Sequence, residues 1–409
     1  MKDKYAELVG KELEREPLSA VRLIELLIRH AHAIGASDLH LDPSEEILIA
    51  RMRIDGSLQD AHQLPIRIHR EMLARLKILA GLRIDEHQTP QDGRFRFSFT
   101  SEDVSPNSYL DVRVSIAPTY YGENAVLRLL SSREDLNTLS SLGLTNEHQI
   151  MIRRALARPH GLILVTGPTG SGKTSTLYVL MHLLNNRNVS LITIEDPIEY
   201  AIDGVNQIQA NRRTGLTFAE GLRSILRQDP NVIGIGEIRD QETAALAIHA
   251  SLTGHLVLST LHTTNAPSAL PRLIDLGIEP YLVASTVTLV IGERLVRKLC
   301  VECRIPQKLS SDQKKLIAEY APGNSSIESY YVSLGCVACN GTGISGRLGL
   351  FEVLEVNGLV RDAAGRKVSA QELSRLAHEK GMLSLLENGF TKAAAGLVAI
   401  DDVLALAYE

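Results

Sequence analysis

Tryptophan is absent from the 409-residue sequence, and aromatic residues make up only 4% of it. No apolar run approaches the ~20 residues of a membrane-spanning helix, the closest being Leu282 to Ile291. The formal net charge of -5 argues against a broadly basic surface for nucleic acid. The charged N-terminus also lacks the apolar segment of a signal peptide. These absences predict a cytoplasmic protein that binds no nucleic acid directly and reaches a membrane only through partner proteins.

Cysteine is also scarce, yet its four occurrences form two C-x-x-C pairs. In a chain without a secretion signal, disulfides are disfavoured, whereas two thiolate pairs suit a tetrahedral zinc site. A redox-active C-x-x-C motif is the alternative, but it leaves the second pair unexplained. We therefore predict a structural zinc ion bound by Cys300, Cys303, Cys336 and Cys339.

An apolar segment at residues 161–166 leads directly into a glycine-rich loop of the form G-x-x-x-x-G-K-T. The backbone N–H groups of such a loop surround the β-phosphate of a nucleotide, its lysine reaches the β- and γ-phosphates, and its threonine ligates Mg²⁺. A helical pattern at residues 175–184 places the phosphates at a helix N-terminus. Lys173 is predicted to bind phosphate and Thr174 to bind magnesium. The predicted ATP-binding residues are Gly167, Pro168, Thr169, Gly170, Ser171, Gly172, Lys173, Thr174 and Ser175.

The chain is long enough for about two or three domains. Helical periodicity at residues 21–33, followed by alternating strand patterns, predicts an α+β domain over residues 1–135. A polar segment at residues 136–142 is predicted to be a linker. Residues 143–409 are predicted to form an ATP-binding α/β domain. Within this domain we expect a cysteine-containing insert at residues 295–355 and a helical C-terminal subdomain at residues 356–409.

Polar residues follow the short apolar strands predicted after the glycine-rich loop. Because these strands alternate with helices, we expect a mainly parallel sheet whose carboxyl ends gather the functional groups. Hydrolysis of ATP requires a group that supports Mg²⁺, a group that orients water and groups that sense or neutralise the γ-phosphate. The candidates are Glu237 for magnesium, Glu195, Asp196 or Glu199 for water, and His255 and His262 for the γ-phosphate.

At these motifs the chain resembles the ATPases of type II secretion and type IV pilus assembly, the GspE/PilB-like proteins. The resemblance covers residues 20–409, nearly the whole chain. Its central motifs are the phosphate-binding loop, Ile194-Glu-Asp-Pro-Ile-Glu-Tyr200, Leu226-Arg-Gln-Asp-Pro230 leading into Gly236-Glu-Ile-Arg-Asp240, and the segment from Ser251-Leu-Thr-Gly-His255 to Thr260-Leu-His-Thr263. Outside these lie Arg53-Ile-Asp-Gly56, Pro90-Gln-Asp-Gly-Arg94, Arg113-Val-Ser115, Gly122-Glu123 with Arg128, both cysteine pairs and Gly346-Arg-Leu-Gly-Leu-Phe-Glu352.

The resemblance implies a homohexameric ring in which a PAS-like N-terminal domain and a RecA-like C-terminal domain close on ATP. By motif, Glu237 is implied to be the Walker-B acid, and Glu199 the catalytic base that orients water. Arginine suits the neutralisation of phosphate charge because its planar fork remains charged. Positive charge is implied to come from Arg113 and Arg128 of the N-terminal domain, with Arg223 and Arg227 as further candidates.

The chain departs from the pattern of the family in three places. Asn231 stands where members commonly have an aspartate, which is expected to remove one carboxylate near Mg²⁺. Glu86-His87-Gln88 stands where a basic pair is usual. The chain also begins close to the first helix of the resemblance. This predicts a short form without the extra N-terminal domain by which longer members dock onto their membrane platform.

The leading prediction is a Mg-ATP-hydrolysing motor that acts on an inner-membrane platform protein, from its cytoplasmic face, to assemble a pilus or pseudopilus. The cysteine pairs favour assembly or secretion, since retraction motors of the superfamily generally lack them. One alternative is a DNA-uptake or conjugation-type ATPase of related fold. Another is a zinc-stabilised nucleotide-binding switch without motor activity, because motifs alone do not prove turnover.

Overall fold

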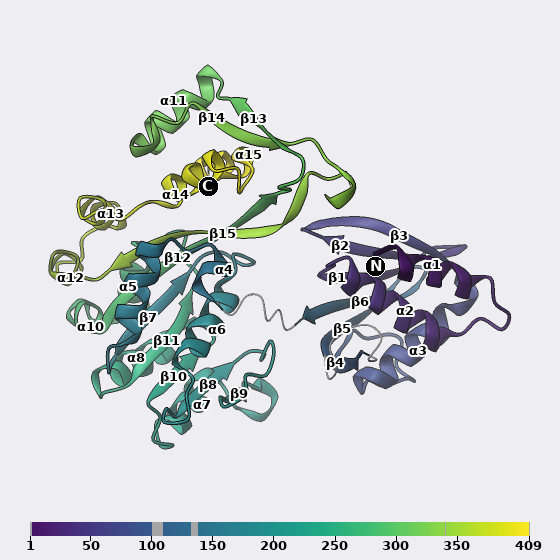
Figure 1. Cartoon of the computed structure of the whole chain (residues 1–409). Coiled ribbons are helices and arrows are strands. Elements are labelled where there is room, and N and C mark those ends of the chain that lie inside the picture. The colour runs from purple at the N-terminus through teal and green to yellow at the C-terminus, as the bar shows by residue number, and fades with distance from the viewer. Residues whose placement is uncertain (1, 100–108, 132–137, 340, 409) are drawn as a thin grey trace. The chain divides into compact units, whose positions relative to one another are not determined.

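The computed structural model describes residues 2–99, 109–131, 138–339 and 341–408. It divides into two compact units, Met1–Arg133 and Glu134–Glu409, which Figure 1 colours from purple to blue and from blue-green to yellow. The predicted domain boundary at residue 135 lies beside this division. Residues 136–137 of the predicted linker lie outside the described residues. Across the described residues, no helix is both long and apolar enough to span a bilayer.

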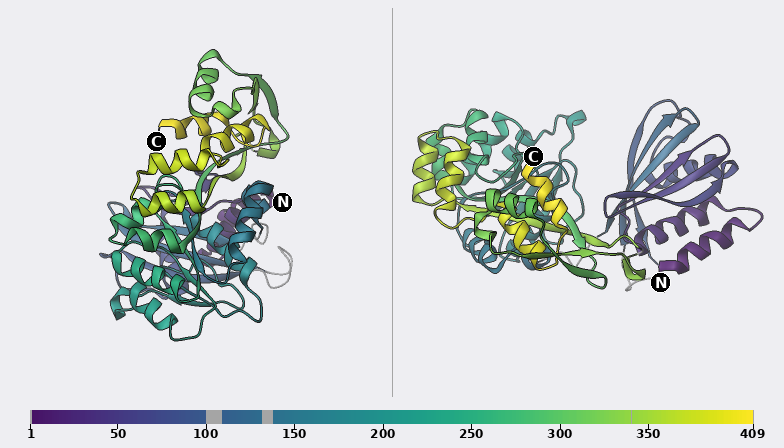
Figure 2. Two further views of the ribbon diagram at one scale, coloured as in Figure 1. Left: turned by 90° about the vertical axis from the view of Figure 1, so that its left-hand side faces the viewer. Right: turned by 90° about the horizontal axis from the view of Figure 1, so that it is seen from above.

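The N-terminal unit packs helices against one face of a six-stranded antiparallel sheet (Figure 2). Its elements are α1 (Lys2–Leu13), α2 (Ala20–Ala33), β1 (Asp38–Pro43), β2 (Ile47–Ile54), β3 (Ser57–Pro65), α3 (His69–Ala80), β4 (Gln91–Ser98), β5 (Tyr109–Thr119) and β6 (Gly122–Ser131). The strand order is β3-β2-β1-β6-β5-β4. Alternate residues of β5 from Leu110 to Ile116 are at most 2% exposed and share one core with α2 and α3. The predicted helix at residues 21–33 and the alternating strands are therefore confirmed.

Two elements of this unit were not predicted. β3 is polar in sequence and pairs only with β2 at the edge of the sheet, so its strand conformation depends on that pairing. α1 has only a short apolar face, of which Val9 is fully buried against the core. Both elements have a weak local sequence pattern. They form because partners elsewhere in the chain stabilise them.

The C-terminal unit contains a seven-stranded sheet in the order β15-β12-β7-β11-β10-β8-β9. Neighbouring strands are parallel except β15, which is antiparallel to β12, so the predicted mainly parallel α/β sheet is confirmed. Its strands are β7 (Gly161–Thr166), β8 (Leu191–Glu195), β9 (Asn206–Gln209), β10 (Val232–Ile235), β11 (Leu256–Leu261), β12 (Val287–Leu299) and β15 (Ile344–Glu355). A separate two-stranded sheet joins β13 (Arg304–Lys308) and β14 (Ser329–Ser333).

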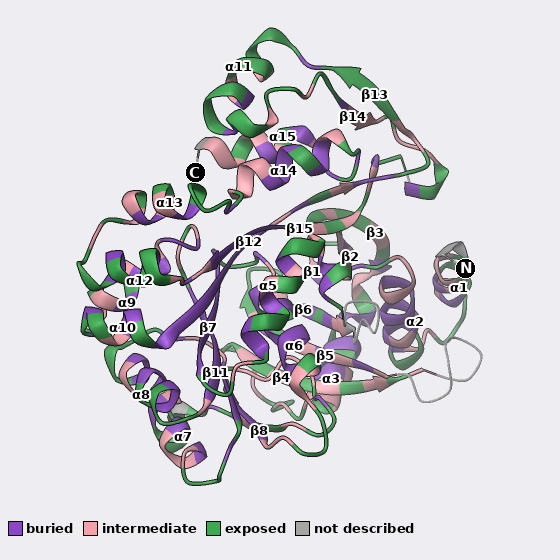
Figure 3. Ribbon diagram, turned by 60° about the vertical axis from the view of Figure 1, so that its left-hand side comes forward, coloured by how far each residue is buried: buried purple, intermediate pink, exposed green. Residues whose placement is uncertain are grey.

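Helices cover both faces of the large sheet, so its central strands are buried on both sides (Figure 3). One face packs against α4 (Leu139–Leu142), α5 (Asn146–Leu156) and α6 (Lys173–Leu184). The other face packs against α7 (Phe218–Ile225), α8 (Gln241–Leu252), α9 (Ala269–Asp275), α10 (Pro280–Thr286), α12 (Gly358–Gly365) and α13 (Ala370–His378). Burial on both faces explains why β7 is an uninterrupted apolar run in the sequence.

The predicted insert at residues 295–355 differs from the structure at both ends. β12 and β15 pair with each other and belong to the large sheet, so the inserted segment is only the part between them. This segment includes α11 (Ser311–Tyr320) and shares a core with the last helices, α14 (Leu385–Ala394) and α15 (Ile400–Ala405). The helices predicted at residues 356–409 thus belong to two different cores. α12 and α13 pack on the large sheet, whereas α14 and α15 pack with the inserted segment.

The end of the predicted linker at residues 136–142 is a capped helix rather than a connection. The hydroxyl of Thr138 accepts a hydrogen bond from the N–H of Ser141, and Leu139 and Leu142 are 1% and 7% exposed in the core beside α6. The prediction was wrong for these residues, because two leucines in a polar segment show too little periodicity to indicate a helix.

Candidate nucleotide-binding site and cysteine cluster

The predicted phosphate-binding loop joins the carboxyl end of β7 to the first turn of α6. Gly172 has a φ of 105°, which favours glycine, and a Cβ there would collide with Oε1 of Glu293. Nζ of Lys173 donates hydrogen bonds to the carbonyl oxygens of Gly167 (2.9 Å) and Pro168 (2.8 Å), and burial lowers its pKa. The lysine is therefore held across the loop at the N-terminus of α6, where β- and γ-phosphates bind.

The side chains of the loop fit a magnesium nucleotide. The hydroxyl of Ser171 is 3% exposed and has no hydrogen-bond partner among the described residues. A buried hydroxyl of this kind is satisfied when a phosphate oxygen accepts its hydrogen bond. Thr174 and Ser175 lie in the first turn of α6 and are exposed, so the hydroxyl of Thr174 is accessible to a magnesium ion.

A buried carboxyl group that was not predicted packs against this loop. Glu293 of β12 is 2% exposed, and its Oε2 accepts a 2.8 Å hydrogen bond from the hydroxyl of Thr176 in α6. Burial raises the pKa of Glu293 to about 8, while the bond from Thr176 and the charges of Lys173 and Lys392 oppose that rise. The only sequence signal for Glu293 is an acidic residue that follows the apolar run ending at Ile291.

Glu237 and His262 come together at the carboxyl ends of β10 and β11. Nε2 of His262 lies 3.1 Å from Oε2 of Glu237, and Nε of Arg239 lies 2.5 Å from the same oxygen. The hydroxyl of Thr260 donates a 2.7 Å hydrogen bond to the carbonyl oxygen of Gly236, which joins the two strand ends. The side chain of Glu237 remains 12% exposed, so this carboxylate can still reach a ligand. Arg239 was not predicted as part of this group.

Glu195, one candidate for orienting water, is committed to a buried network. It is 4% exposed at the end of β8, and one oxygen accepts hydrogen bonds from the Thr193 hydroxyl (2.6 Å) and Nε2 of Gln207 (3.0 Å). The other oxygen accepts a hydrogen bond from the hydroxyl of Tyr178. Because both oxygens are bonded by protein donors, Glu195 is poorly placed to take a proton from an attacking water.

His255 and Asn231 lie at the amino ends of their strands, opposite to the phosphate-binding loop. His255 precedes β11, and its Nδ1 lies 3.0 Å from a main-chain carbonyl oxygen at the end of α8. Asn231 precedes β10, and its Oδ1 accepts a 2.7 Å hydrogen bond from the main chain before β8. Arg227 follows α7 and donates to the carbonyl oxygen of Arg223, which itself pairs with Glu220.

These positions correct two predictions about the site. In a parallel sheet the amino ends of the strands lie a whole strand length from the carboxyl ends, where the phosphate-binding loop begins. His255 therefore does not reach a γ-phosphate held by the same chain, and the aspartate-to-asparagine departure at Asn231 removes no carboxylate near its magnesium.

Strand pairing in the N-terminal unit aligns four arginines and one aspartate in a single row. Arg94 pairs with Arg113, Arg113 with Arg128, Arg128 with Asp38, and Asp38 with Arg53. Paired residues project from the same face of a sheet, and here that face is opposite to the buried one. Asp38 contacts Arg128 at 3.3 Å and Arg53 at 3.7 Å, so the row keeps an excess of positive charge.

The chain departs from the family pattern at Glu86-His87-Gln88, and His87 there belongs to an ion-pair cluster of the N-terminal unit. Glu123 lies 2.7 Å from Nζ of Lys77, which is 1% exposed, and 2.8 Å from Nδ1 of His87. Burial acts to raise the pKa of Glu123, but hydrogen bonds from Lys77 and His87 overcome it and lower the pKa. His87 thus contacts Glu123 at a position where the family usually has a basic residue.

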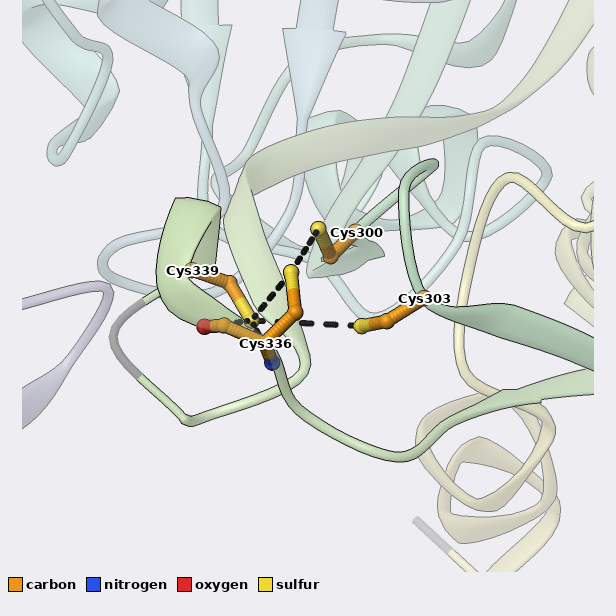
Figure 4. Close-up of side chains that lie close together, drawn as sticks. All are labelled: Cys300, Cys303, Cys336 and Cys339. Carbon is orange, nitrogen blue, oxygen red and sulfur yellow. Dashed lines mark hydrogen bonds between the residues drawn. The ribbon is translucent and has the colours of Figure 1, made fainter.

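The two C-x-x-C pairs come together between β12 and β15 (Figure 4). The four Sγ atoms of Cys300, Cys303, Cys336 and Cys339 all lie within 4.8 Å of one another. Three contacts among them measure 3.7, 3.8 and 3.9 Å. Tetrahedral zinc with bonds of about 2.3 Å places its sulfur ligands about 3.8 Å apart. The geometry therefore fits zinc.

The surroundings of one cysteine in the cluster favour its thiolate form. Burial acts to raise the pKa of the Cys339 thiol, but N–H groups of Cys336 and Gly343 donate to its sulfur and lower the pKa to about 6. A thiolate, rather than a thiol, is the metal ligand. The cysteine cluster can therefore hold zinc as the sequence predicts, with both pairs contributing.

We expect the purified chain to carry one Zn²⁺, measured by elemental analysis of the reduced protein. Structural zinc contributes on the order of 10 kcal/mol, so Cys339→Ser should lose the metal and raise amide hydrogen exchange in the segment between β12 and β15. Val337 is 95% exposed in the same turn, so Val337→Ser is a control that should retain zinc. A reduced wild-type protein without metal would contradict the assignment.

The loop after β7 and the acidic residues at the carboxyl ends of neighbouring parallel strands define a P-loop nucleotide-hydrolysing domain of the α/β class. Residues 13–405 match the model of the family described as "Type II/IV secretion system protein". The chain belongs to this family and is a secretion or pilus ATPase of the GspE/PilB-like type.

Two relatives and one solved structure illustrate the similarity. Type II secretion system ATPase E of Vibrio cholerae is 40% identical over 390 residues, which cover 95% of this chain and 75% of that protein. The type IV pilus assembly ATPase PilB of Thermus thermophilus is 39% identical over 412 residues, covering 100% of this chain and 45% of PilB. The structure of the pilus retraction motor PilT with bound ADP superposes with a TM-score of 0.65 at 25% identity, covering 94% of this chain and 96% of PilT.

The chain is shorter than the curated relatives that it matches. It spans 66% of type II secretion system protein E from Xanthomonas campestris, to which it is 42% identical, and 45% of PilB from Thermus thermophilus. The similarity therefore extends over both units of this chain, and further segments of those relatives have no counterpart in the matched residues.

Proposed function

We propose that the chain forms a homohexameric motor that hydrolyses Mg-ATP to drive the assembly of a pilus or of a pseudopilus for type II secretion. The observation that carries this proposal is the match across both units to a type II secretion ATPase and to PilB at about 40% identity. The motor would act in the cytoplasm, at the inner face of the inner membrane, by binding a platform protein there.

The phosphate-binding loop and the strand ends supply the groups for hydrolysis. Lys173 binds the β- and γ-phosphates, and Glu199 is the base that holds and orients the attacking water. Thr174 and Glu237 would hold Mg²⁺, which neutralises charge on the phosphates when bound. His262, which lies beside Glu237, connects this carboxylate with the γ-phosphate.

The arginine row of the N-terminal unit supports its proposed role in neutralising the charge that develops during hydrolysis. Arg113 and Arg128 would reach ATP when this unit, of the PAS-like type, closes on a RecA-like unit. Arg227 follows α7 and donates a hydrogen bond to the carbonyl oxygen of Arg223. Arg227 is a further candidate for neutralising this charge.

The cysteine cluster favours assembly or secretion over retraction within this family. A DNA-uptake or conjugation-type ATPase remains the second candidate, and a nucleotide-binding switch without motor activity the third. The formal net charge of -5 supports a protein platform as the partner rather than a nucleic acid.

Light scattering and steady-state kinetics test the proposal together. With Mg²⁺ and ATP, the 44.8-kDa chain should elute as a hexamer, and its specific activity should rise with protein concentration as rings form. Turnover should not respond to added DNA. A monomer that hydrolyses ATP at full rate would contradict the ring, and a DNA-stimulated rate would favour the DNA-uptake candidate.

A further inference from the structure

A buried polar network lies between α6, the helix that follows the phosphate-binding loop, and the loop that carries Glu199. At its centre the carboxylate of Glu195 accepts hydrogen bonds from Thr193, Gln207 and Tyr178. Tyr178 of α6 and Thr193 of β8 are fully buried. A carboxylate in such surroundings is costly unless donors satisfy it, and three donors do so here. The network is therefore a fixed structure rather than a solvated group of side chains.

The network binds the main chain of the Glu199 loop at three points. The N–H of Glu199 donates a 3.1 Å hydrogen bond to the hydroxyl oxygen of Tyr178. Gln207 donates from Nε2 to the carbonyl oxygen of Tyr200 at 3.2 Å, and its Oε1 accepts from the N–H of Ile202 at 2.7 Å. The backbone from Glu199 to Ile202 is thus oriented by Tyr178 and Gln207, both of which donate to Glu195.

Tyr178 has the central position because its hydroxyl both donates and accepts. Its proton is directed to Glu195, which leaves an oxygen lone pair for the N–H of Glu199. Burial, and then the charge of Glu195, raises the pKa of Tyr178, so the hydroxyl stays protonated at neutral pH. The ring also packs edge-on against that of Tyr200, with centroids 4.5 Å apart.

Tyr178 and Lys173 belong to the same helix, which begins at the phosphate-binding loop. A rigid helix that holds both the phosphates and the Glu199 loop fixes the distance between the γ-phosphate and the water-orienting carboxylate. We propose that Tyr178 is a positioning residue for hydrolysis, which holds Glu199 in register with the phosphate-binding loop through the main-chain N–H of Glu199. This proposal rests on the role of Glu199 in the proposed function.

Tyr178→Phe tests this proposal in the full chain, because it removes only the hydroxyl and keeps the ring. We expect kcat to fall about 10- to 100-fold, since a displaced catalytic group loses rate while substrate binding remains. The dissociation constant for ATP should change less than about twofold, because Lys173 and the loop glycines are unaffected. Tyr200→Phe is the matched control, since its hydroxyl takes no part in these bonds, and it should retain wild-type kcat.

Two further measurements separate positioning from a general loss of structure. In a Glu199→Gln background, adding Tyr178→Phe should leave the residual rate within about twofold, because both changes act through one group. Amide hydrogen exchange should rise at residues 199–202 in Tyr178→Phe and stay unchanged in the phosphate-binding loop. Tyr178→Phe also removes a donor from the buried Glu195 carboxylate, which could destabilise the fold. The double variant Tyr178→Phe with Glu195→Gln removes this buried charge, and its amide exchange should still rise only at residues 199–202.

The outcomes distinguish this proposal from the assignment of Glu199. A wild-type kcat in Tyr178→Phe, or a further large loss of rate in the Glu199→Gln background, would overturn the positioning role. Full activity in Glu199→Gln would instead overturn the base assignment. Selective exchange at residues 199–202 would then still show that Tyr178 holds the loop, but a role in hydrolysis through Glu199 would be excluded.

Discussion

Lys173→Ala is expected to abolish ATP turnover, and Glu199→Gln is expected to stop hydrolysis while leaving nucleotide binding intact. The first change removes the cation that contacts the β- and γ-phosphates, and the second removes the base while preserving the shape of the side chain. Loss of such groups costs about 10³-fold or more in rate. Steady-state phosphate release measures turnover, and equilibrium titration with a fluorescent ATP analogue measures binding.

Exposed residues of the same types provide matched controls. Lys315, with its side chain 81% exposed, and Glu319, also exposed, lie on α11, away from the phosphate-binding loop. Lys315→Ala and Glu319→Gln should hydrolyse ATP at the wild-type rate. Normal turnover in Glu199→Gln would move the base assignment to Glu237, because both oxygens of Glu195 are already bonded by protein donors.

Arg113→Ala and Arg128→Ala are each expected to lower kcat strongly, with nucleotide affinity changed less. Positive charge delivered to the γ-phosphate is worth about 10³-fold or more in rate, whereas loss of an exposed strand arginine changes stability by only ~0.5 kcal/mol. Steady-state kinetics and thermal unfolding of the same preparations measure the two effects. The side chain of Arg128 is 63% exposed, so the variant should keep its fold.

Arg67→Ala is the control for these variants, since Arg67 is exposed in the same unit and lies outside the arginine row. The isolated C-terminal unit, begun at Thr138 so that α4 keeps its cap, should bind ATP and hydrolyse it poorly. If this unit matched the full chain in specific activity, the N-terminal unit would serve only for docking. The catalytic assignment of Arg113 and Arg128 would then be wrong.

Local patterns were sufficient where the function resides in contiguous residues. The phosphate-binding loop, its strand and its helix were predicted from a single stretch, because glycine, lysine and threonine at fixed spacing encode the loop directly. Glu237 and His262 were also predicted, since both follow short apolar strands. The four cysteines formed a recognisable set because no other cysteine is present in the chain.

The predictions failed where the position of a residue depends on strand pairing. His255 and Asn231 were placed near the nucleotide, but each precedes its strand and lies at the amino edge of the sheet. The predicted insert is too long at both ends, because no local sequence pattern indicates that β12 and β15 pair with each other. Glu195 was a candidate base until its buried partners were known.

The sequence by itself thus determined the class of protein, the phosphate-binding loop and the residues available for catalysis. The tertiary structure decided which of them meet: the arginine row across five strands, Glu293 beside the phosphate-binding loop, and the Tyr178 network around Glu195. The physical reason is the range of the interactions. Loop chemistry and periodicity act over a few residues, whereas strand pairing and the satisfaction of buried carboxylates join residues far apart in the chain.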